Sequence, residues 1–211
     1  MKIGIVGAGK IGATAARLFV GAGQEVALSN SRGPESLRRL VSELGPKSHA
    51  MTVDDAARFA EMVLLAVPWR TPEALPSPAT VRGKIVIDAM NPYAASGGIE
   101  RLDTSTSSSE ETLKRLPGAR LVKAFNTIHY KHLSERGRTD VPLDKRHAIF
   151  LAGDDADAKR VVSRLIEEIG FAPVDTGSLH DGRKQEPNTP VYNQVLTGLE
   201  GHALAGRPVS S

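Results

Sequence analysis

The 211-residue sequence contains no cysteine, so disulfide bonds, thiolate metal sites and cysteine nucleophiles are excluded. It also lacks any apolar run close to the ~20 residues that a membrane-spanning helix needs. The chain begins directly with a strand pattern, without the charged and apolar stretches of a secretion signal. We therefore expect a cytoplasmic protein that makes no membrane contact.

A strong excess of charge of one sign is missing as well. Lys and Arg number 27 and Asp and Glu number 24, which gives a net charge of +3 at pH 7. An excess this small and this evenly spread favours anionic small ligands and argues against nucleic acid as a partner. The length, with 40% hydrophobic and 24% charged residues, suits one globular α/β domain with a substantial core.

What the sequence does contain is a glycine-rich turn between a strand pattern and a helix pattern. Gly7 allows the sharp turn, Gly9 leaves room for a pyrophosphate, and Gly12 lets the helix lie close to the sheet. The helix N-terminus then offers free N–H groups to the phosphates. We predict a dinucleotide-binding site here, the alternative being a purely structural glycine turn. Its predicted cofactor-binding residues are Gly7, Ala8, Gly9, Lys10, Ile11 and Gly12.

The residues that follow the second predicted strand, 25–29, select the cofactor. NAD-selective folds place Asp or Glu here to bind the ribose 2′-hydroxyl, but this chain has Asn30, Ser31 and Arg32. Arg32 can pair with a 2′-phosphate, and Ser31 and Asn30 can donate hydrogen bonds to it. These residues predict NADP(H), unless Arg32 is a solvated turn residue. Arg38 and Arg39 either add positive field or only increase solubility.

Strand and helix patterns alternate along the rest of the chain, which predicts an α/β, Rossmann-like NAD(P)-binding fold with a mostly parallel twisted sheet and helices on both faces. We expect one domain over 1–211, with 177–211 as a C-terminal loop and helix extension. A helix start is expected at Thr189-Pro190, with Leu196, Leu199 and Leu204 on one apolar side. The other predicted strands are 62–67, 84–89, 119–125, 147–152 and 171–176, and the other predicted helices are 36–45, 51–60, one from Ser109, and 156–169.

In an open parallel sheet, ligands bind beyond the carboxyl ends of the strands. Val67, Pro68 and Trp69 follow one buried strand and are expected to border the cofactor, although packing is an equal alternative for Trp69. The ends of the next two strands add further predicted cofactor-binding residues. These residues are Asn91, Asn126 and Thr127.

The loops show no Ser-His-Asp, HExxH or paired-carboxylate arrangement, so no catalytic acid or base and no metal site is predicted. A dinucleotide enzyme without such groups suits direct hydride transfer between two heterocycles. That reaction needs the two carbons held face to face at roughly 3–3.5 Å and little proton transfer. The histidines are interpreted as loop or surface residues, namely His129, His132, His180 and His202.

Several segments make the chain resemble the NADP-dependent oxidoreductases of the deazaflavin coenzyme F420 over nearly its whole length. The Ser31-Arg32 pair and Val67-Pro68-Trp69 are the more specific of these marks, and the glycine turn is the less specific one. The remaining marks are Lys123-Ala124-Phe125-Asn126-Thr127-Ile128, Ala152-Gly153-Asp154-Asp155 and Val174-Asp175-Thr176-Gly177.

The resemblance implies a Rossmann-like domain, a homodimer, and reversible hydride exchange between NADPH and coenzyme F420. It also implies that Ser31 and Arg32 hold the 2′-phosphate, while Val67, Pro68 and 126–130 frame the nicotinamide. One departure lies beside the expected deazaflavin site, where His129-Tyr130-Lys131-His132 stand in place of small residues.

Two alternatives therefore stay open. An NADPH-dependent reductase of an imine, a flavin or a ferric chelate is one, and for an imine Tyr130, His129 or Tyr192 would be the proton donor. A non-catalytic NADPH-binding regulatory protein is the other. The segment 185–193 is interpreted as a loop before a dimer-packing helix, with a substrate wall as the alternative, and His129, Lys131, Arg183 and Lys184 are candidate contacts for an anionic acceptor.

Overall fold

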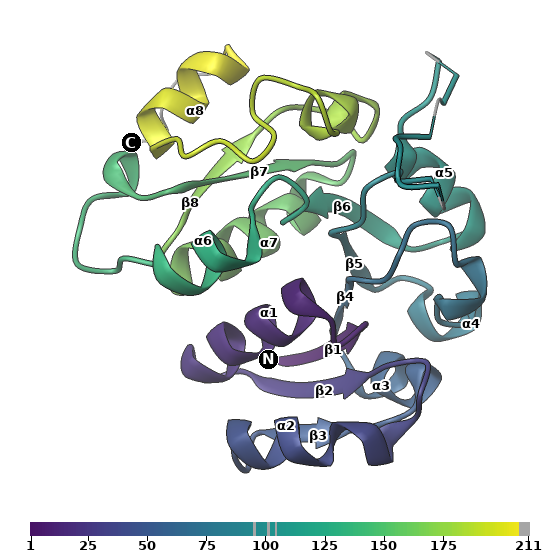
Figure 1. The fold of residues 1–211 in the computed structure, drawn as a ribbon. Coiled ribbons are helices and arrows are strands. Elements are labelled where there is room, and N and C mark those ends of the chain that lie inside the picture. The colour runs from purple at the N-terminus through teal and green to yellow at the C-terminus, as the bar shows by residue number, and fades with distance from the viewer. Residues whose placement is uncertain (95, 101, 104, 207–211) are drawn as a thin grey trace.

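The chain folds around one eight-stranded sheet, shown in Figure 1. The computed structural model describes residues 1–94, 96–100, 102–103 and 105–206, so that 207–211 of the predicted extension lie outside the described part. The strands are β1 (Lys2–Val6), β2 (Glu25–Ser29), β3 (Ser48–Ala50), β4 (Met62–Leu65), β5 (Ile85–Asp88), β6 (Arg120–Ala124), β7 (Ala148–Ala152) and β8 (Ala172–Asp175).

The spatial order of the strands is β3-β2-β1-β4-β5-β6-β7-β8. The first six strands run parallel in the 3-2-1-4-5-6 order of dinucleotide-binding folds, with Ile3 opposite both Val26 and Met62. This order confirms the predicted Rossmann-like α/β fold. β7 is antiparallel to β6, and β8 is parallel to β7, so the sheet continues with two strands of reversed direction.

Helices cover both faces of this sheet (Figure 1). Phe19, Leu133 and Leu165 belong to the apolar cluster on one face, and Ala57 and Val81 belong to the cluster on the other. The α-helices are α1 (Lys10–Gly21), α2 (Arg38–Leu44), α3 (Val53–Phe59), α4 (Pro78–Val81), α5 (Ser108–Arg115), α6 (Tyr130–Glu135), α7 (Ala156–Glu168) and α8 (Gly198–Ala205). Short 3₁₀ helices are η1 (Pro34–Leu37), η2 (Pro72–Ala74), η3 (Leu143–Lys145) and η4 (His180–Gln185).

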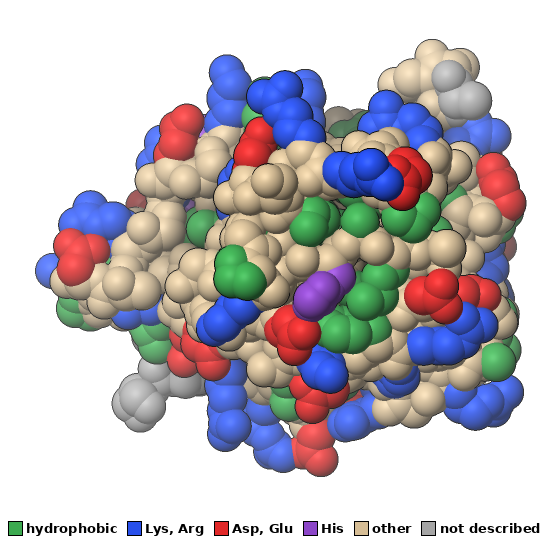
Figure 2. Space-filling model, turned by 90° about the horizontal axis from the view of Figure 1, so that it is seen from below, with side chains coloured by type: hydrophobic (Ala, Val, Ile, Leu, Met, Phe, Trp, Pro, Cys, Tyr) green, Lys and Arg blue, Asp and Glu red, His purple; other side chains and the backbone are tan. Residues whose placement is uncertain are grey.

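Seen from below, the molecule has a surface on which basic and acidic side chains alternate without a large field of one sign (Figure 2). This pattern agrees with the near balance of charges in the sequence. Many of these side chains pair locally, as Arg39 does with Glu43 on α2 and Arg58 with Asp55 on α3. Exposed pairs of this kind add little to stability, at about 0.2–1 kcal/mol each.

One predicted helix start was off by one residue and another was wrong. The helix predicted from Ser109 begins at Ser108, because Ser107 is the N-cap residue and forms a reciprocal capping box with Glu110. The C-terminal helix does not begin at Thr189-Pro190. Asn188 and Asn193 have positive φ angles there, of 69° and 55°, which a continuous helix excludes.

The C-terminal helix α8 begins instead after Thr197, which forms a second capping box with Glu200. The expected apolar side was also wrong in part, because Leu199 is 56% and Leu204 54% exposed. α8 packs on β7 and β8 through smaller residues, since a Cβ on Gly201 would lie 3.0 Å from Val174. Close approach of this helix to the sheet leaves its leucines facing outward.

The burial of His147, at the start of β7, makes a pH-dependent contribution to stability. Its ring is 8% exposed, and burial, with Arg136 and His132 nearby, lowers the pKa of His147 to about 4. The unfolded chain binds this proton near pH 6.5, so the free energy of unfolding should fall by about 2–3 kcal/mol as the pH decreases from 6.5 towards 4. In His147→Phe, chemical denaturation at several pH values should show a free energy of unfolding that no longer falls by about 2–3 kcal/mol between pH 6.5 and 4.

His49→Phe is the matched control, because His49 is partly exposed on β3 and pairs with Glu25. It should retain the decrease between pH 6.5 and 4. An unchanged pH profile in His147→Phe would contradict this account of His147.

Candidate dinucleotide-binding site

The glycine turn joins β1 to α1, and each glycine has a distinct steric environment. Gly7 has φ +103°, and a Cβ there would lie 2.4 Å from the carbonyl oxygen of Ala66. A Cβ on Gly12 would lie 1.8 Å from the carbonyl oxygen of Gly7. A Cβ on Gly9 would meet no protein atom within 4 Å of it in the described part of the chain. Gly7 and Gly12 are therefore required by the fold, whereas Gly9 borders open space.

The N-terminus of α1 faces this open space without a side-chain cap. Gly9 is the N-cap residue, and neither a capping side chain nor an acidic residue is present in the first turn of the helix. The first N–H groups of α1 are thus available to an external acceptor, and the helix dipole favours a negative charge. A phosphate group fits this combination of free donors and open space.

The corner after β2 is shaped by Asn30. Its side-chain oxygen accepts a hydrogen bond from the Arg32 N–H at 2.9 Å, and its Nδ2 donates to Ser36 Oγ at 2.9 Å. These bonds form a turn that uses the Asn30 amide, so Ser31 and Arg32 are the residues that present free polar side chains. Both are exposed.

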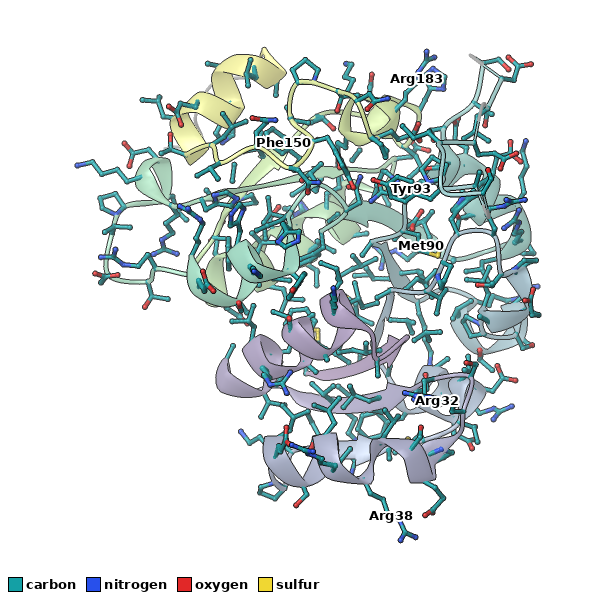
Figure 3. The ribbon with its side chains drawn as sticks, in the orientation of Figure 1. Arg32, Arg38, Met90, Tyr93, Phe150 and Arg183 are labelled. Carbon is teal, nitrogen blue, oxygen red and sulfur yellow. The ribbon has the colours of Figure 1, made fainter. Side chains whose placement is uncertain are left out.

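Three arginines lie near this corner, and they differ in their partners. Arg38 pairs with Glu35 at 2.5 Å, and Arg39 with Glu43 at 2.9 Å. The Arg32 guanidinium has no ion-pair partner among the described residues. Figure 3 shows Arg38 pointing away from the sheet, whereas Arg32 lies on the same side as Met90 and Tyr93. Arg32 is therefore the arginine that can receive an anionic ligand.

The residues after β4 separate into two groups. The position of a Cβ on Gly7 would be only 2.9 Å from the Val67 side chain, so Val67 lies directly beside the glycine turn. Trp69 is 8% exposed, and its Nε1 donates to Ser108 O at 3.0 Å and to Thr112 Oγ1 at 3.2 Å. The described contacts of Trp69 are thus those of a packing residue between β4 and α5. Pro68 lies between Val67, which borders the glycine turn, and Trp69, which packs in the core.

The ends of β5 and β6 are joined by an amide pair. Asn91 Nδ2 donates to the carbonyl oxygen of Asn126 at 2.9 Å, and Asn126 Nδ2 donates to Asn91 Oδ1 at 3.1 Å. Phe125, just before, has φ +65°, an uncommon backbone conformation for a bulky residue and one that tends to occur at functional sites. The structure therefore places Asn91, Asn126 and Thr127 together at the carboxyl edge of the sheet.

Sequence reasoning did not foresee how segment 185–193 packs. Asn126 Nδ2 also donates to Gln185 O at 2.7 Å, and the Asn193 N–H donates to Thr127 O at 2.8 Å. The Tyr192 and Tyr93 hydroxyls lie 2.6 Å apart, and burial together with this contact raises the pKa of Tyr192. The segment thus lies against the carboxyl edge of the sheet, as the substrate-wall alternative requires.

The start of α6 contacts the glycine turn. His129 is the N-cap residue of α6, and the Lys10 ammonium lies 4.9 Å from the centre of the Tyr130 ring. The two other candidate contacts lie elsewhere. Lys184 pairs with Asp181 at 2.8 Å, and Arg183 lies at the outer edge of the molecule, far from Arg32 (Figure 3).

Two buried charges behind the site were missed at the sequence level. Lys123 and Asp88 occupy paired positions on β6 and β5, and both are completely buried. A lysine inside the otherwise apolar run Leu121–Phe125 was the available signal. In the described part of the chain, no group of three or more His, Cys, Asp or Glu residues could hold a metal ion, and no helix is long and apolar enough to cross a membrane.

Comparison with known proteins shows what the N-terminal part of this site, with the glycine turn and Arg32, is similar to. Residues 2–92 match the family model described as NADP oxidoreductase, coenzyme F420-dependent. A hypothetical protein, SMa0349 from Sinorhizobium meliloti, has a solved structure with 32% identity and a TM-score of 0.80, covering 93% of this chain and 95% of that one. A protein from Arthrobacter sp. FB24 whose provisional name is F420-dependent NADP-reductase is 28% identical with a TM-score of 0.74, covering 87% of each chain.

The match of residues 2–92 to this family model and the likeness to the Arthrobacter structure confirm the resemblance found in the sequence. A curated relative is metalloreductase STEAP3 of Rattus norvegicus, 31% identical over 186 residues that make up 88% of this chain. Those residues are 36% of the relative, so the chain spans about a third of its length.

The different surroundings of Gly9 and Gly12 predict opposite effects of adding a methyl group. Gly9→Ala should fold with a loss of no more than about 1 kcal/mol, because the methyl group meets no protein atom and alanine is only a poorer N-cap. Its NADPH affinity should fall by about tenfold or more, since the methyl group takes up space beside the phosphates. Thermal unfolding and calorimetric titration with NADPH measure the two effects.

Gly12→Ala is the comparison variant and should be unstable whether or not NADPH is present, because its methyl group would overlap the Gly7 carbonyl. If Gly9→Ala binds NADPH as tightly as the unchanged protein, the phosphates do not lie over Gly9.

Proposed function

We propose that this chain binds NADP(H) along the carboxyl edge of β1, β2, β4, β5 and β6 and transfers a hydride between NADPH and a flat redox heterocycle, most simply the deazaflavin coenzyme F420. The observation that carries the proposal is the exposed guanidinium of Arg32, which has no ion-pair partner among the described residues and follows β2 in a segment, 30–32, that contains no carboxylate. The match of residues 2–92 to a family model of NADP oxidoreductases supports the same cofactor.

The residues present fit the cofactor at three separated points. The N-terminus of α1 and the open space over Gly9 would receive the pyrophosphate. Ser31 and Arg32 would receive the 2′-phosphate, because a guanidinium forms two parallel hydrogen bonds with such a group. Val67, Pro68 and the amide pair of Asn91 and Asn126 would border the nicotinamide end.

The cofactor supplies the hydride, and the side chains supply position and shelter. Two ring carbons must be held face to face, and water must be kept from the acceptor. Asn126 donates to the Gln185 carbonyl oxygen and the Asn193 N–H donates to that of Thr127, and with the contact of Tyr192 and Tyr93 these bonds attach segment 185–193 to this edge of the sheet as a wall. We expect the acceptor to lie between this wall and the start of α6.

A second acceptor class is supported by the relationship to a metalloreductase. A bound flavin would take the hydride of one NADPH and pass its two electrons singly to two ferric ions, with release of a proton. His129, Tyr130 and Lys131 add the bulk and charge that distinguish this site. An imine is a further alternative that needs a proton donor. Burial and the contact with Tyr93 raise the pKa of Tyr192, which makes its hydroxyl a weaker acid than an ordinary tyrosine and a poorer donor for this step.

A third alternative is an NADPH-binding regulatory protein without turnover. A homodimer stays a prediction of the resemblance, and a cytoplasmic location stays a prediction from the sequence. The exposed leucines of α8, Leu199 and Leu204, are the surface that a second copy would cover.

Replacing Arg32 tests the cofactor. Arg32→Ala should weaken NADPH binding by about 1.5–3 kcal/mol, because a charge-assisted pair with the 2′-phosphate is lost. NADH binding should change little. Arg38→Ala is the matched control, since Arg38 already pairs with Glu35 and points away, and it should leave both affinities unchanged. Equal weakening of NADPH and NADH by Arg32→Ala would show that Arg32 does not read the 2′-phosphate.

The acceptor is tested by following NADPH absorbance with four substrates in parallel: oxidised coenzyme F420, free flavin, ferric citrate and a cyclic imine. We expect the fastest NADPH consumption with F420, accompanied by loss of the deazaflavin absorbance. Turnover only with flavin or ferric citrate would replace F420 by the metalloreductase-like alternative. Tight NADPH binding without turnover of any acceptor would instead favour the regulatory one.

A further inference from the structure

Lys123 and Asp88 are the most unusual residues behind the candidate site. Both side chains are 0% exposed, and they lie at paired positions on β6 and β5. Burial of a charge is costly unless the group is paired and hydrogen-bonded. Apolar residues would fill the same space at lower cost, so the two charges need an explanation beyond packing.

Their hydrogen bonds form one closed network, here called the Lys123 network and made up of Lys123, Asp88, Ser108 and Ser109. The Lys123 ammonium donates to Ser108 Oγ at 3.0 Å, to Ser109 Oγ at 3.2 Å and to Met90 O at 3.3 Å, which uses all three of its hydrogens. Ser109 Oγ in turn donates to Asp88 Oδ2 at 2.7 Å. A serine hydroxyl therefore connects the two charges.

The network holds the backbone of Met90 from both sides. The Met90 N–H donates to Asp88 Oδ1 at 2.9 Å, while its carbonyl oxygen accepts from Lys123. Met90 lies beside Tyr93 at this edge of the sheet (Figure 3). Asn91 is the next residue, and its amide pairs with that of Asn126, which follows Lys123 on the same chain segment. The buried charges thus hold the residue just before Asn91, and Asn91 in turn pairs with Asn126.

The Lys123 network also contacts the C-terminal segment, at η4 and Glu186. A Cβ on Gly182 of η4 would lie 3.0 Å from Lys123 Cδ, so η4 packs directly on the lysine stem. A second contact joins the same segment to Ser108, whose N–H donates to Glu186 Oε1 at 2.8 Å. One lysine therefore links β5, α5 and the segment that forms the wall of the site.

We propose that Lys123 is a positioning residue: together with Asp88 and the two serines it fixes the Asn91–Asn126 amide pair, and the amide pair orients the nicotinamide carboxamide. The proposal rests on the proposed NADP(H) function. Hydrogen bonds to charges in a low-dielectric interior are strong and directional, so a displaced Met90 would leave buried charges unsatisfied. An apolar core at this place would fill the space without fixing the direction of the Asn91 side chain.

The test separates the nicotinamide end of the cofactor from its adenosine end. The variants are Lys123→Met, which keeps the stem and removes the charge, and Ser109→Ala, which keeps both charges and removes the hydroxyl between them. Lys84→Met is the matched control, because the Lys84 ammonium also donates to main-chain carbonyls, those of Ala57 and Arg58, but just before β5 begins.

Two measurements are made on each variant, and neither needs an acceptor. Calorimetric titration with adenosine 2′,5′-bisphosphate measures binding at the adenosine end. Saturation-transfer difference NMR with NADP⁺ measures how much saturation reaches the nicotinamide H2 proton relative to the adenine H8 proton. We expect Lys123→Met and Ser109→Ala to bind the bisphosphate as the unchanged protein does but to lose most of the nicotinamide signal. Lys84→Met should retain both.

A nicotinamide signal that is unchanged in folded Ser109→Ala and Lys123→Met would overturn the proposal and leave the network a purely structural role. If Lys123→Met does not fold, Ser109→Ala decides, because it removes only one oxygen atom. Failure of the proposed function itself looks different, since the unchanged protein would then bind neither the bisphosphate nor NADP⁺.

Discussion

The close contact between α1 and the end of β1 is the constraint on which the rest of the structure depends. A single methyl group at Gly7 or Gly12 would overlap a backbone carbonyl, so the turn exists only because two side chains are absent. The contact aims the free N–H groups of α1 at the carboxyl edge of the adjacent strands β1 and β4, from which the chain continues to β2 on one side and to β5 on the other. Arg32, Val67 and the amide pair are useful to a cofactor only because this edge is fixed first.

Charge acts in two ways around that edge. At the surface, Arg38 and Arg39 form local ion pairs, whereas Arg32 has no ion-pair partner in the part of the chain that the structure describes. In the interior, Lys123 and Asp88 are fully hydrogen-bonded and cannot reach a ligand. The exposed charge can select the ligand, whereas the buried charges can only determine the shape of what surrounds it.

The parts predicted well from the sequence are those that depend on local steric rules. The glycine turn, the apolar strand 62–67 and the α7 pattern each follow from a few neighbouring residues, and they suffice for the fold class. β3 was missed because it has only three residues, Ser48–Ala50, and is recognisable only by its pairing with β2. The expected helix at Thr189 was wrong because long-range contacts, such as Asn193 with Thr127, hold that segment in turns.

For the candidate site, too, the sequence predicted only what depends on neighbouring residues. Ser31 and Arg32 could be proposed because they follow directly on a recognisable strand. The contacts of Gln185 with Asn126 and of Tyr192 with Tyr93 join residues far apart in the chain, and no local pattern reports them. A place at the end of a strand does not by itself tell a ligand contact from a packing residue. Trp69 has such a place, and its indole is hydrogen-bonded within the core beside α5.

The reversal of direction at β7 has a consequence for the order in which the molecule becomes complete. Six parallel strands and the phosphate end of the site are finished by Ala124, whereas Asn193 reaches Thr127 only after the chain has passed through the two reversed strands and returned. During synthesis, the residues proposed to bind the phosphates would thus be complete long before segment 185–193, which is proposed to shelter the acceptor, has been made. Under the proposed function, substitutions in segment 185–193 would then change the electron acceptor while leaving the binding of NADP(H) intact.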